Sequence, residues 1–377
     1  LPGRWARADS PAVTNWYATA FFFGRRLHRE LGVPVGLLMV AWGGTPIEAW
    51  MPRSLLERLP AAAEFLTNSD AYPSRYPELL LQWEKRRTNL LAAGRSNELR
   101  QLRKPWPPDR NPSLAAVQYN SRIAPLIPYP MRGAIWYQGE ANSHGVRTLC
   151  YAELLTAMIT HWRSAWEDEF PFGIVQLPGF RDPPTAPVQT NSTWAVMREQ
   201  QLRVVQSVPR TGLAVTIDLG EVDDIHPKRK TEVGERLAAW ALREVYGRME
   251  IVACGPLYRD MAVEGSAIRI RFDHAEGLHA RGGPPRALAI AGEDHVWHAA
   301  EGRIEGNELV VSAAAVPRPV AVRYGWADFP PCNLYNGAGL PASPFRTDDW
   351  PIVLDTGSNA PRTMRAATPP ASSSSRP

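Results

Sequence analysis

The hydrophobic and polar positions of the chain follow two patterns in turn through its middle part. Between residues 133 and 246, short continuous apolar runs alternate with longer segments in which apolar residues recur at helical spacing. Continuous runs of this length predict buried strands, and helical spacing predicts amphipathic helices. The predicted elements are, in order, a strand over 133–137, a helix over 149–166, a strand over 172–177, a helix over 193–205, a strand over 213–217 and a helix over 230–246. Strands that alternate with helices favour a parallel sheet with helices on both faces.

The first fifty residues extend this pattern. Apolar residues between Ser10 and Arg29 lie at helical spacing, and Ser10 followed by Pro11 is typical of a helix start. Residues 35–42 form a continuous apolar run that stops at Gly43-Gly44. Such a run is typical of a strand covered on both faces. We therefore expect a helix over 10–29 and a further strand over 35–42.

Three other segments have different patterns. Residues 51–113 are polar and mostly helical with Pro-rich ends, so we interpret them as a helical insertion whose basic residues form a solvated helix face. After residue 254 the chain changes to short alternating runs separated by Gly, Asn and Pro, which predicts an antiparallel β-rich accessory region over 255–350. Residues 356–377 contain no Leu, Ile, Val, Phe or Trp and predict a disordered tail. The α/β domain would then span 1–254.

Composition excludes several classes of protein. The 377 residues are 44% hydrophobic and 21% charged with a net charge of +4, which is typical of a folded globular protein and not of a disordered, collagenous or coiled-coil chain. So small a charge gives no support for a nucleic-acid or membrane-surface partner. No stretch reaches the ~18 consecutive apolar residues of a membrane span. The three cysteines have no C-x-x-C spacing and His295-x-x-His298 lacks further ligands, so we expect no metal and no cofactor.

Polar residues follow two of the predicted strands where each strand ends. In open parallel sheets, ligands bind beyond the carboxyl ends of the strands. Gly43-Gly44 follows the first apolar run, and its main-chain N–H groups can approach a ligand closely because no Cβ intervenes. Gln138, Glu140 and Asn142 follow the strand over 133–137, and an amide there can donate to a developing oxyanion. The alternative for both loops is an ordinary surface turn.

The loop after the strand over 213–217 contains a histidine preceded by two carboxylates. Asp223 and Asp224 stand three and two positions before His226. A carboxylate on one ring nitrogen fixes the tautomer and leaves the other nitrogen free to accept a proton, so His226 is the candidate general base. Alternatively, the aspartates cap the following helix and the histidine is solvated. An amide, a glycine pair and an Asp/His pair together are the equipment of acyl transfer, although no nucleophile accompanies them.

Three blocks of the sequence resemble one known family. Residues 42–50 (WGGTPIEAW), 133–142 (GAIWYQGEAN) and 224–230 (DIHPKRK) are similar to blocks of the sialate O-acetylesterase family, a branch of the SGNH (GDSL-type) hydrolases. The likeness extends from about Val13 to Asp348. It implies a three-layer α/β/α, flavodoxin-like sandwich with β-rich accessory structure, and hydrolysis of acetyl esters on sialic acid hydroxyls.

The resemblance also implies roles for individual residues. Gly44 would supply a main-chain oxyanion donor, Gln138 a side-chain donor and His226 the base. Asp223 has the spacing to His226 that is usual in SGNH enzymes, whereas Asp224 matches this family's acidic position, so both stay candidates. Residues expected to contact substrate are Trp42, Gly43, Glu140, Asn142 and Arg198. Arg198 matches a family position, but its helix could equally present a charged outer face.

One departure from the family pattern concerns the nucleophile. Family members carry a Gly-Gln-Ser-Asn block with the nucleophilic serine before the region that matches this chain, and no such block is present here. Ser10 is better explained as a helix cap. We therefore expect the chain to be the C-terminal greater part of an exported esterase that is inactive without its nucleophile strand. The alternatives are an acetylesterase acting on acetylated xylan and a carbohydrate-binding protein without catalysis; in each case the expected partner is a sugar.

Overall fold

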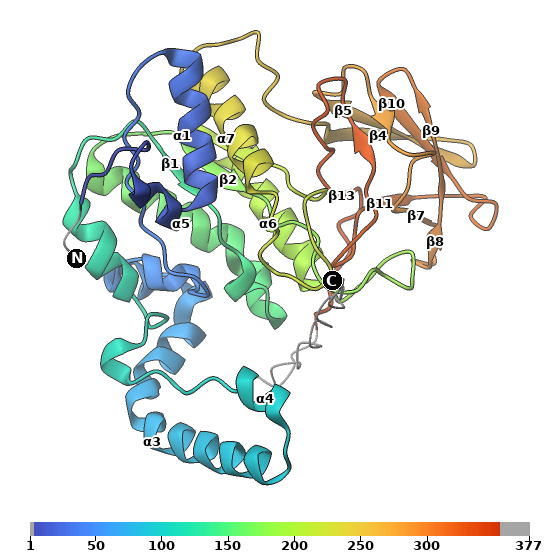
Figure 1. Cartoon of the computed structure of the whole chain (residues 1–377). Coiled ribbons are helices and arrows are strands. Elements are labelled where there is room, and N and C mark those ends of the chain that lie inside the picture. Colours follow the sequence, from blue (N-terminus) through green and yellow to red (C-terminus); the bar gives the residue numbers. More distant parts are fainter. Residues whose placement is uncertain (1–3, 355–377) are drawn as a thin grey trace, which may run out of the picture.

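A parallel three-stranded sheet lies at the centre of the N-terminal part of the molecule (Figure 1). The computed structural model describes residues 4–354, so the tail predicted over 356–377 lies outside the described residues. The strands run in the order β1-β2-β3, and each falls within or close to a segment predicted from its apolar run. Their bounds are β1 (Ala134–Trp136), β2 (Phe172–Val175) and β3 (Thr211–Ala214).

Helices cover both faces of this sheet. Side chains alternate along β2, so Phe172 and Ile174 enter a core shared with one pair of helices, while Gly173 faces Trp240 on the opposite side. A Cβ at Gly173 would lie 2.7 Å from the Trp240 ring, so the second pair of helices packs directly on the backbone of the sheet. The first pair is α5 (Tyr151–Trp166) and α6 (Thr193–Ser207); the second is α1 (Ala18–Leu31) and α7 (Lys230–Glu244), which lie side by side (Figure 1).

Two predictions near the N-terminus are wrong. Residues 35–42 form no strand, and Leu38, Val40 and Trp42 within them are exposed. The apolar run predicted burial, but a strand also needs a neighbour to complete its backbone hydrogen bonds, and residues 4–354 provide none for this segment. The helix predicted from Ser10 starts later: Pro11–Asn15 is a 3₁₀ turn and α1 begins at Ala18. The Ser10 hydroxyl donates to the carbonyl of Arg7 and caps no helix.

Residues 51–113 add helices and no strand to the structure. Helix α3 projects away from the sheet together with α4 (Figure 1). Only Leu66 and Leu90 of α3 are buried, and its charged residues lie on solvated faces, as the sequence predicted for this segment. The helices are α2 (Arg53–Leu56), α3 (Ala63–Ala92) and α4 (Ser96–Gln101).

The C-terminal third consists of antiparallel sheets around a second core. Ile270 and Val311 of one four-stranded sheet pack with Ile290 and Val322 of the other. The first sheet has the order β4 (Leu257–Glu264), β5 (Ala267–Asp273), β10 (Glu308–Ser312) and β9 (Glu301–Glu305). The second has the order β13 (Phe345–Arg346), β11 (Ala321–Tyr324), β7 (Leu288–Ala291) and β8 (Trp297–Ala299), and β12 (Leu334–Tyr335) pairs with β6 (His279–Ala280).

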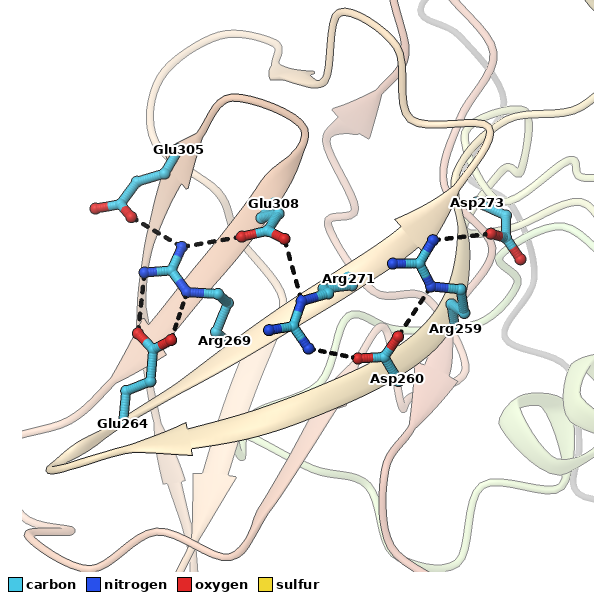
Figure 2. Close-up of polar contacts among 8 residues, drawn as sticks. All are labelled: Arg259, Asp260, Glu264, Arg269, Arg271, Asp273, Glu305 and Glu308. Atoms are coloured by element: carbon cyan, nitrogen blue, oxygen red, sulfur yellow. Dashed lines mark hydrogen bonds and ion pairs between the residues drawn. The ribbon is translucent and has the colours of Figure 1, made fainter.

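The outer face of the first sheet carries a network of ion pairs (Figure 2). Alternation along β5 turns Ile268 and Ile270 inward, and Arg269 outward. Arg269 donates to Glu264 at 2.7 and 2.9 Å, and also contacts Glu305 and Glu308. This solvent-facing side is charged and the opposite side apolar, which fixes the register of the strands because a one-residue slip would bury the arginines.

The two parts of the molecule meet along the loops that leave β2 and β3. Gln176 donates to the Ser343 hydroxyl at 2.9 Å, and Tyr335 donates to Asp218 at 3.4 Å. Both Gln176 and Asp218 follow strands of the parallel sheet, so the β-rich part packs beside its carboxyl edge. Among residues 4–354, no helix is both long enough and apolar enough to cross a membrane.

Candidate active site at the carboxyl edge of the parallel sheet

The glycine-pair loop lies against the end of β1. Gln138, two residues beyond β1, donates from Nε2 to the carbonyl oxygen of Thr45 at 3.2 Å. The Thr45 hydroxyl donates to the Trp42 carbonyl at 2.8 Å and accepts from Trp50 Nε1 at 2.9 Å, so it fixes the loop from both sides. Gly44 has a φ of 75°, a conformation that a residue with a Cβ rarely adopts. The exposed glycine loop therefore faces solvent directly beside the Gln138 amide.

The Gln138 amide is held in one orientation. Its Oε1 accepts from the hydroxyl of Tyr151 at 2.7 Å, and its Nε2 donates to Asn142 Oδ1 at 2.8 Å as well as to Thr45. Tyr151 is fully buried and accepts in turn from Trp136 Nε1 at 3.1 Å. Both Nε2 protons are engaged, so donation to a reacting oxygen would replace one of these bonds. The bond to Thr45 is the longer one and hence the weaker.

Asn142 lies in the interior and connects three segments. Its Oδ1 also accepts from the main-chain nitrogen of Ile47 at 2.9 Å, and its Nδ2 donates to Glu48 Oε2 at 2.9 Å. The other oxygen of Glu48 is paired with Arg147 at 2.5 Å. Asn142 and Glu48 are each 1% exposed. The structure therefore places Asn142 beneath the surface loop, in a supporting position, and not at a surface where it would touch a sugar.

His226 lies in the exposed loop after β3. Its side chain is 81% exposed, and Asp224 Oδ1 lies 3.6 Å from Nδ1 while accepting from the His226 main-chain nitrogen at 2.8 Å. Asp223 is exposed. Helix α7 begins at Lys230 with Arg229 at its N-cap, so no aspartate caps this helix as the alternative expected, whereas the solvated histidine of that alternative agrees with the structure. Of the two carboxylates, Asp224 is the one that the structure places beside the imidazole.

Electrostatic contacts connect the His226 loop to the end of β1. Burial raises the pKa of Glu140, while the charges of His226 and Lys230 lower it in part. Burial lowers the pKa of Lys230, and the charge of Glu140 opposes this. The Lys230 ammonium lies 5.1 Å from the centre of the Tyr137 ring. The Gly44 loop therefore contacts Gln138, and the start of α7, which follows the His226 loop, contacts Tyr137 beside Gln138 at the same edge of the sheet.

Arg198 and Trp42 have different environments. Arg198 is fully buried in α6 and donates to the carbonyl oxygens of Pro178, Gly325 and Ala327. Burial lowers its pKa to about 10. The prediction of a charged outer face at this position is therefore wrong: the guanidinium is closed off from solvent and joins the loop after β2 to the β-rich part. The Trp42 ring is exposed, and the Arg122 guanidinium lies 5.0 Å from its centre.

Several residues that build the site were not predicted. Glu48 carries the clearest signal, because it is a lone carboxylate in the otherwise apolar segment Ile47–Trp50 directly after the glycine loop. A buried carboxylate needs a charged or hydrogen-bonding partner. Tyr151 and Arg147 carry no comparable signal in the sequence. Across residues 4–354, no three His, Cys, Asp or Glu side chains converge so as to hold a metal ion, and His295 stacks on Trp350 with ring centres 3.8 Å apart.

Comparison with known proteins points to one family. The sequence model described as "Carbohydrate esterase, sialic acid-specific acetylesterase" matches residues 106–243, which include Gln138 and His226. The crystal structure of a carbohydrate acetylesterase from Xanthomonas citri is 34% identical and superposes with a TM-score of 0.70, covering 88% of this chain and 65% of that one. The sialate O-acetylesterase of Rattus norvegicus is 29% identical over 88% of this chain. The chain is similar to sialate O-acetylesterases over most of its own length.

The match to the sialate O-acetylesterase family extends over most of this chain but not over its relatives. The chain covers 64% of the rat protein and 64% of the Homo sapiens sialate O-acetylesterase, to which it is 26% identical over 91% of its own length. It therefore spans less than two thirds of the length of these relatives. The family predicted from the WGGT, WYQGE and DIHP blocks is confirmed.

Proposed function

We propose that this chain is the greater part of an esterase that hydrolyses O-acetyl esters of sialic acid or a related sugar. The observation that carries the proposal is the meeting of the Gly44, Gln138 and His226 loops at the carboxyl edge of one parallel sheet. A main-chain donor, an amide donor and a base at a common edge suit acyl transfer. The names of the relatives, all acetylesterases, support the same reaction class.

The proposed reaction needs a serine hydroxyl from outside this chain. His226 accepts the serine proton at Nε2, with Asp224 beside Nδ1. The serine oxygen attacks the acetyl carbon, and the main-chain N–H of Gly44 and Nε2 of Gln138 donate to the oxyanion. The sugar oxygen leaves with the proton from His226, forming an acetyl-enzyme. Water, deprotonated by His226, then attacks this ester, and acetate and the free serine are released.

We further propose where that serine enters. Within the described chain, β1 pairs only with β2, so its other edge is open, and the apolar residues 35–42 lack a strand partner. A strand between these two segments would give both of them a backbone partner and would cover Leu38 and Val40. It would extend the parallel sheet of an α/β/α SGNH fold, with its carboxyl end beside Gly44 and Gln138.

The sugar would then lie over the exposed Trp42 and Gly43, with the largely buried Glu140 beside them. The flat Trp42 ring offers an apolar face for the C–H groups of a pyranose. Asp223 remains available at the rim of the surface, whereas Asn142 and Arg198 are excluded from direct contact by their burial. We also propose that the enzyme acts outside the cytoplasm.

Acetate release from defined substrates tests the proposal. The gene would be expressed with its upstream coding sequence, and acetate measured with O-acetylated sialic acid and with acetylated xylan. We expect release from the sialic acid substrate that is lost in His226→Ala and in a variant of the upstream serine. Preferential acetate release from acetylated xylan would show that the substrate is xylan and not sialic acid, while the proposed ester hydrolysis would stand. Sugar binding with no acetate release above the serine variant would contradict the esterase and support the binding protein.

A further inference from the structure

We propose that Glu48 is a positioning residue, which fixes the orientation of the Gln138 amide through Asn142. This inference rests on the proposed function for its catalytic consequence, because Gln138 is there the oxyanion donor. Glu48 lies in the 3₁₀ turn Ile47–Trp50, directly after the glycine loop and one residue away from the Ile47 nitrogen that also binds Asn142. It touches neither solvent nor the proposed substrate surface, since it is 1% exposed.

The direction of the hydrogen bonds follows from Glu48. A carboxylate only accepts hydrogen bonds, so Asn142 must turn its NH₂ group toward Glu48, at 2.9 Å. Asn142 Oδ1 must then face the Ile47 nitrogen and Gln138. Because Oδ1 only accepts, Gln138 must present Nε2 to it, which leaves Oε1 for the Tyr151 hydroxyl. Glu48 therefore acts with the Ile47 N–H and the Thr45 carbonyl to set both amides, and the Gln138 NH₂ group lies beside the glycine loop.

Arg147 makes this arrangement possible at a buried position. An isolated buried carboxylate is strongly unfavourable, and the Arg147 guanidinium supplies the counter-charge at 2.5 Å. Arg147 is itself 32% exposed, so the pair extends from the interior to the surface. Glu48 thus remains an acceptor directly below the site. If Gln138 rotated by half a turn about its amide, its Oε1 would face Asn142 Oδ1 and Thr45 O, and no donor would point to the glycine loop.

Kinetics of Glu48→Gln test this role. They are measured in the protein expressed with its upstream sequence and nucleophilic serine, called here the serine-bearing protein. The substitution keeps the shape of Glu48 but adds a donor, so it weakens one of the contacts that hold Asn142 and Gln138 in this orientation. We expect kcat to fall roughly 10- to 100-fold, part of the ~100- to 1,000-fold effect of losing an oxyanion donor, with KM within about threefold of wild type. Glu57→Gln, at an exposed carboxylate that pairs with Arg53 in the neighbouring helix, is the matched control and should leave both constants unchanged.

A double-mutant cycle separates positioning from general damage. If Glu48 acts through Gln138, then Glu48→Gln should lower kcat less than about twofold once Gln138 is already alanine. An equal loss in both backgrounds, or an unchanged kcat in the single variant, would overturn the inference. Asn142→Ala interrupts the same connection between Glu48 and Gln138. It should likewise lower kcat much less once Gln138 is alanine, and it replaces Glu48→Gln in the test if that variant does not fold.

A spectroscopic measurement keeps the inference independent of the enzyme activity. The side-chain amide resonances of Gln138 can be assigned in glutamine-labelled protein by their disappearance in Gln138→Ala. With both protons hydrogen-bonded, they should exchange slowly with water; Glu48→Gln should shift them and speed exchange, while Glu57→Gln should not. Resonances that are identical in wild type and Glu48→Gln would reject the positioning role even if acetate release confirmed the esterase. If the serine-bearing protein released no acetate but the resonances still shifted in Glu48→Gln, the esterase function would be rejected and the positioning role would stand.

Discussion

The side-chain nitrogen of Gln138 lies 3.2 Å from the carbonyl oxygen of Thr45, a residue 93 positions earlier in the chain. This bond joins the loop after β1 to the glycine-pair loop. The main-chain N–H of Gly44 and the side-chain amide of Gln138 thereby lie close together, although their segments are far apart in the sequence. The blocks over 42–50 and 133–142 are therefore in direct contact in the folded chain.

Replacing Gln138 with alanine in the serine-bearing protein should remove one oxyanion donor. The expected fall in kcat is roughly 100- to 1,000-fold. Steady-state acetate release measures it, and Gln82→Ala, at an exposed glutamine on α3, is the control that should retain full activity. A loss of less than about tenfold would mean that Gln138 is not the donor.

The two aspartates before His226 should differ in their effect on turnover. Asp224 lies 3.6 Å from Nδ1, so Asp224→Asn should weaken the orientation of the base and lower kcat by about tenfold or more. Asp223→Asn changes an exposed carboxylate in the same loop and should lower kcat less than about twofold. The pH profile of kcat should move only in Asp224→Asn. The reverse order would assign the role to Asp223.

Removing the carboxylate of Asp348 should destabilise the β-rich part. Asp348 is 1% exposed and pairs with Arg323 at 2.7 and 2.8 Å, and with Arg346 at 3.2 Å. Asp348→Asn leaves the buried guanidinium of Arg323 without a charge partner, while Arg346 keeps Glu199 at 2.7 Å, so the free energy of unfolding should fall by about 3–5 kcal/mol. Urea denaturation measures the change. Asp349→Asn, at the adjacent exposed carboxylate, should change it by less than about 0.5 kcal/mol.

Acid should act on the same buried pair. Burial alone would raise the pKa of Asp348, but the hydrogen bond and charge of Arg323 outweigh it, so the pKa of Asp348 is lowered. The stabilisation is therefore complete above the ordinary value of 3.8 and is lost as the pH falls through the lowered pKa. The difference in unfolding free energy between wild type and Asp348→Asn should accordingly shrink below about pH 4 and stay constant above it.

Glu140 should show the opposite dependence on pH. Burial raises its pKa in the folded protein, and the charges of His226 and Lys230 offset this in part. The unfolded chain loses this proton near pH 4.5, before the folded protein does, so the stability contributed by the protonated form is lost as pH rises through the raised pKa. Glu140→Gln removes this loss. Its stability relative to wild type, measured by urea denaturation between pH 4 and 8, should therefore increase with pH.

The exposed Glu153 provides the comparison for that measurement, since Glu153→Gln should show no such trend. A stability difference between wild type and Glu140→Gln that is constant over the whole pH range would contradict a raised pKa at Glu140.

The sequence predicted most of the secondary structure because burial leaves a local pattern. The run over 172–177 is apolar because both faces of β2 are covered, and the alternation over 267–272 reflects one buried and one charged face of β5. The prediction of a strand over 35–42 was wrong because this apolar run is neither buried nor paired with a strand among residues 4–354.

The candidate site was predictable only in part. Gln138 and His226 follow β1 and β3, so a general property of parallel sheets locates them, whereas Gly44 follows an apolar run that forms no strand. The support beneath them depends on contacts between distant segments, such as Glu48 with Asn142 and Arg147, 94 and 99 positions apart. Neither spacing nor composition encodes these contacts. The burial of Arg198 was equally invisible, because it depends on loops from the β-rich part.

The unpaired edge of β1 has a consequence for handling the protein. Among residues 4–354, β1 has a strand partner on one edge alone, and Leu38 and Val40 are exposed; an open strand edge is a template on which strands of other molecules can add. A preparation of this length should therefore oligomerise and precipitate as its concentration rises. Placing lysine at position 38 or 40 would keep it monodisperse by electrostatic repulsion between copies.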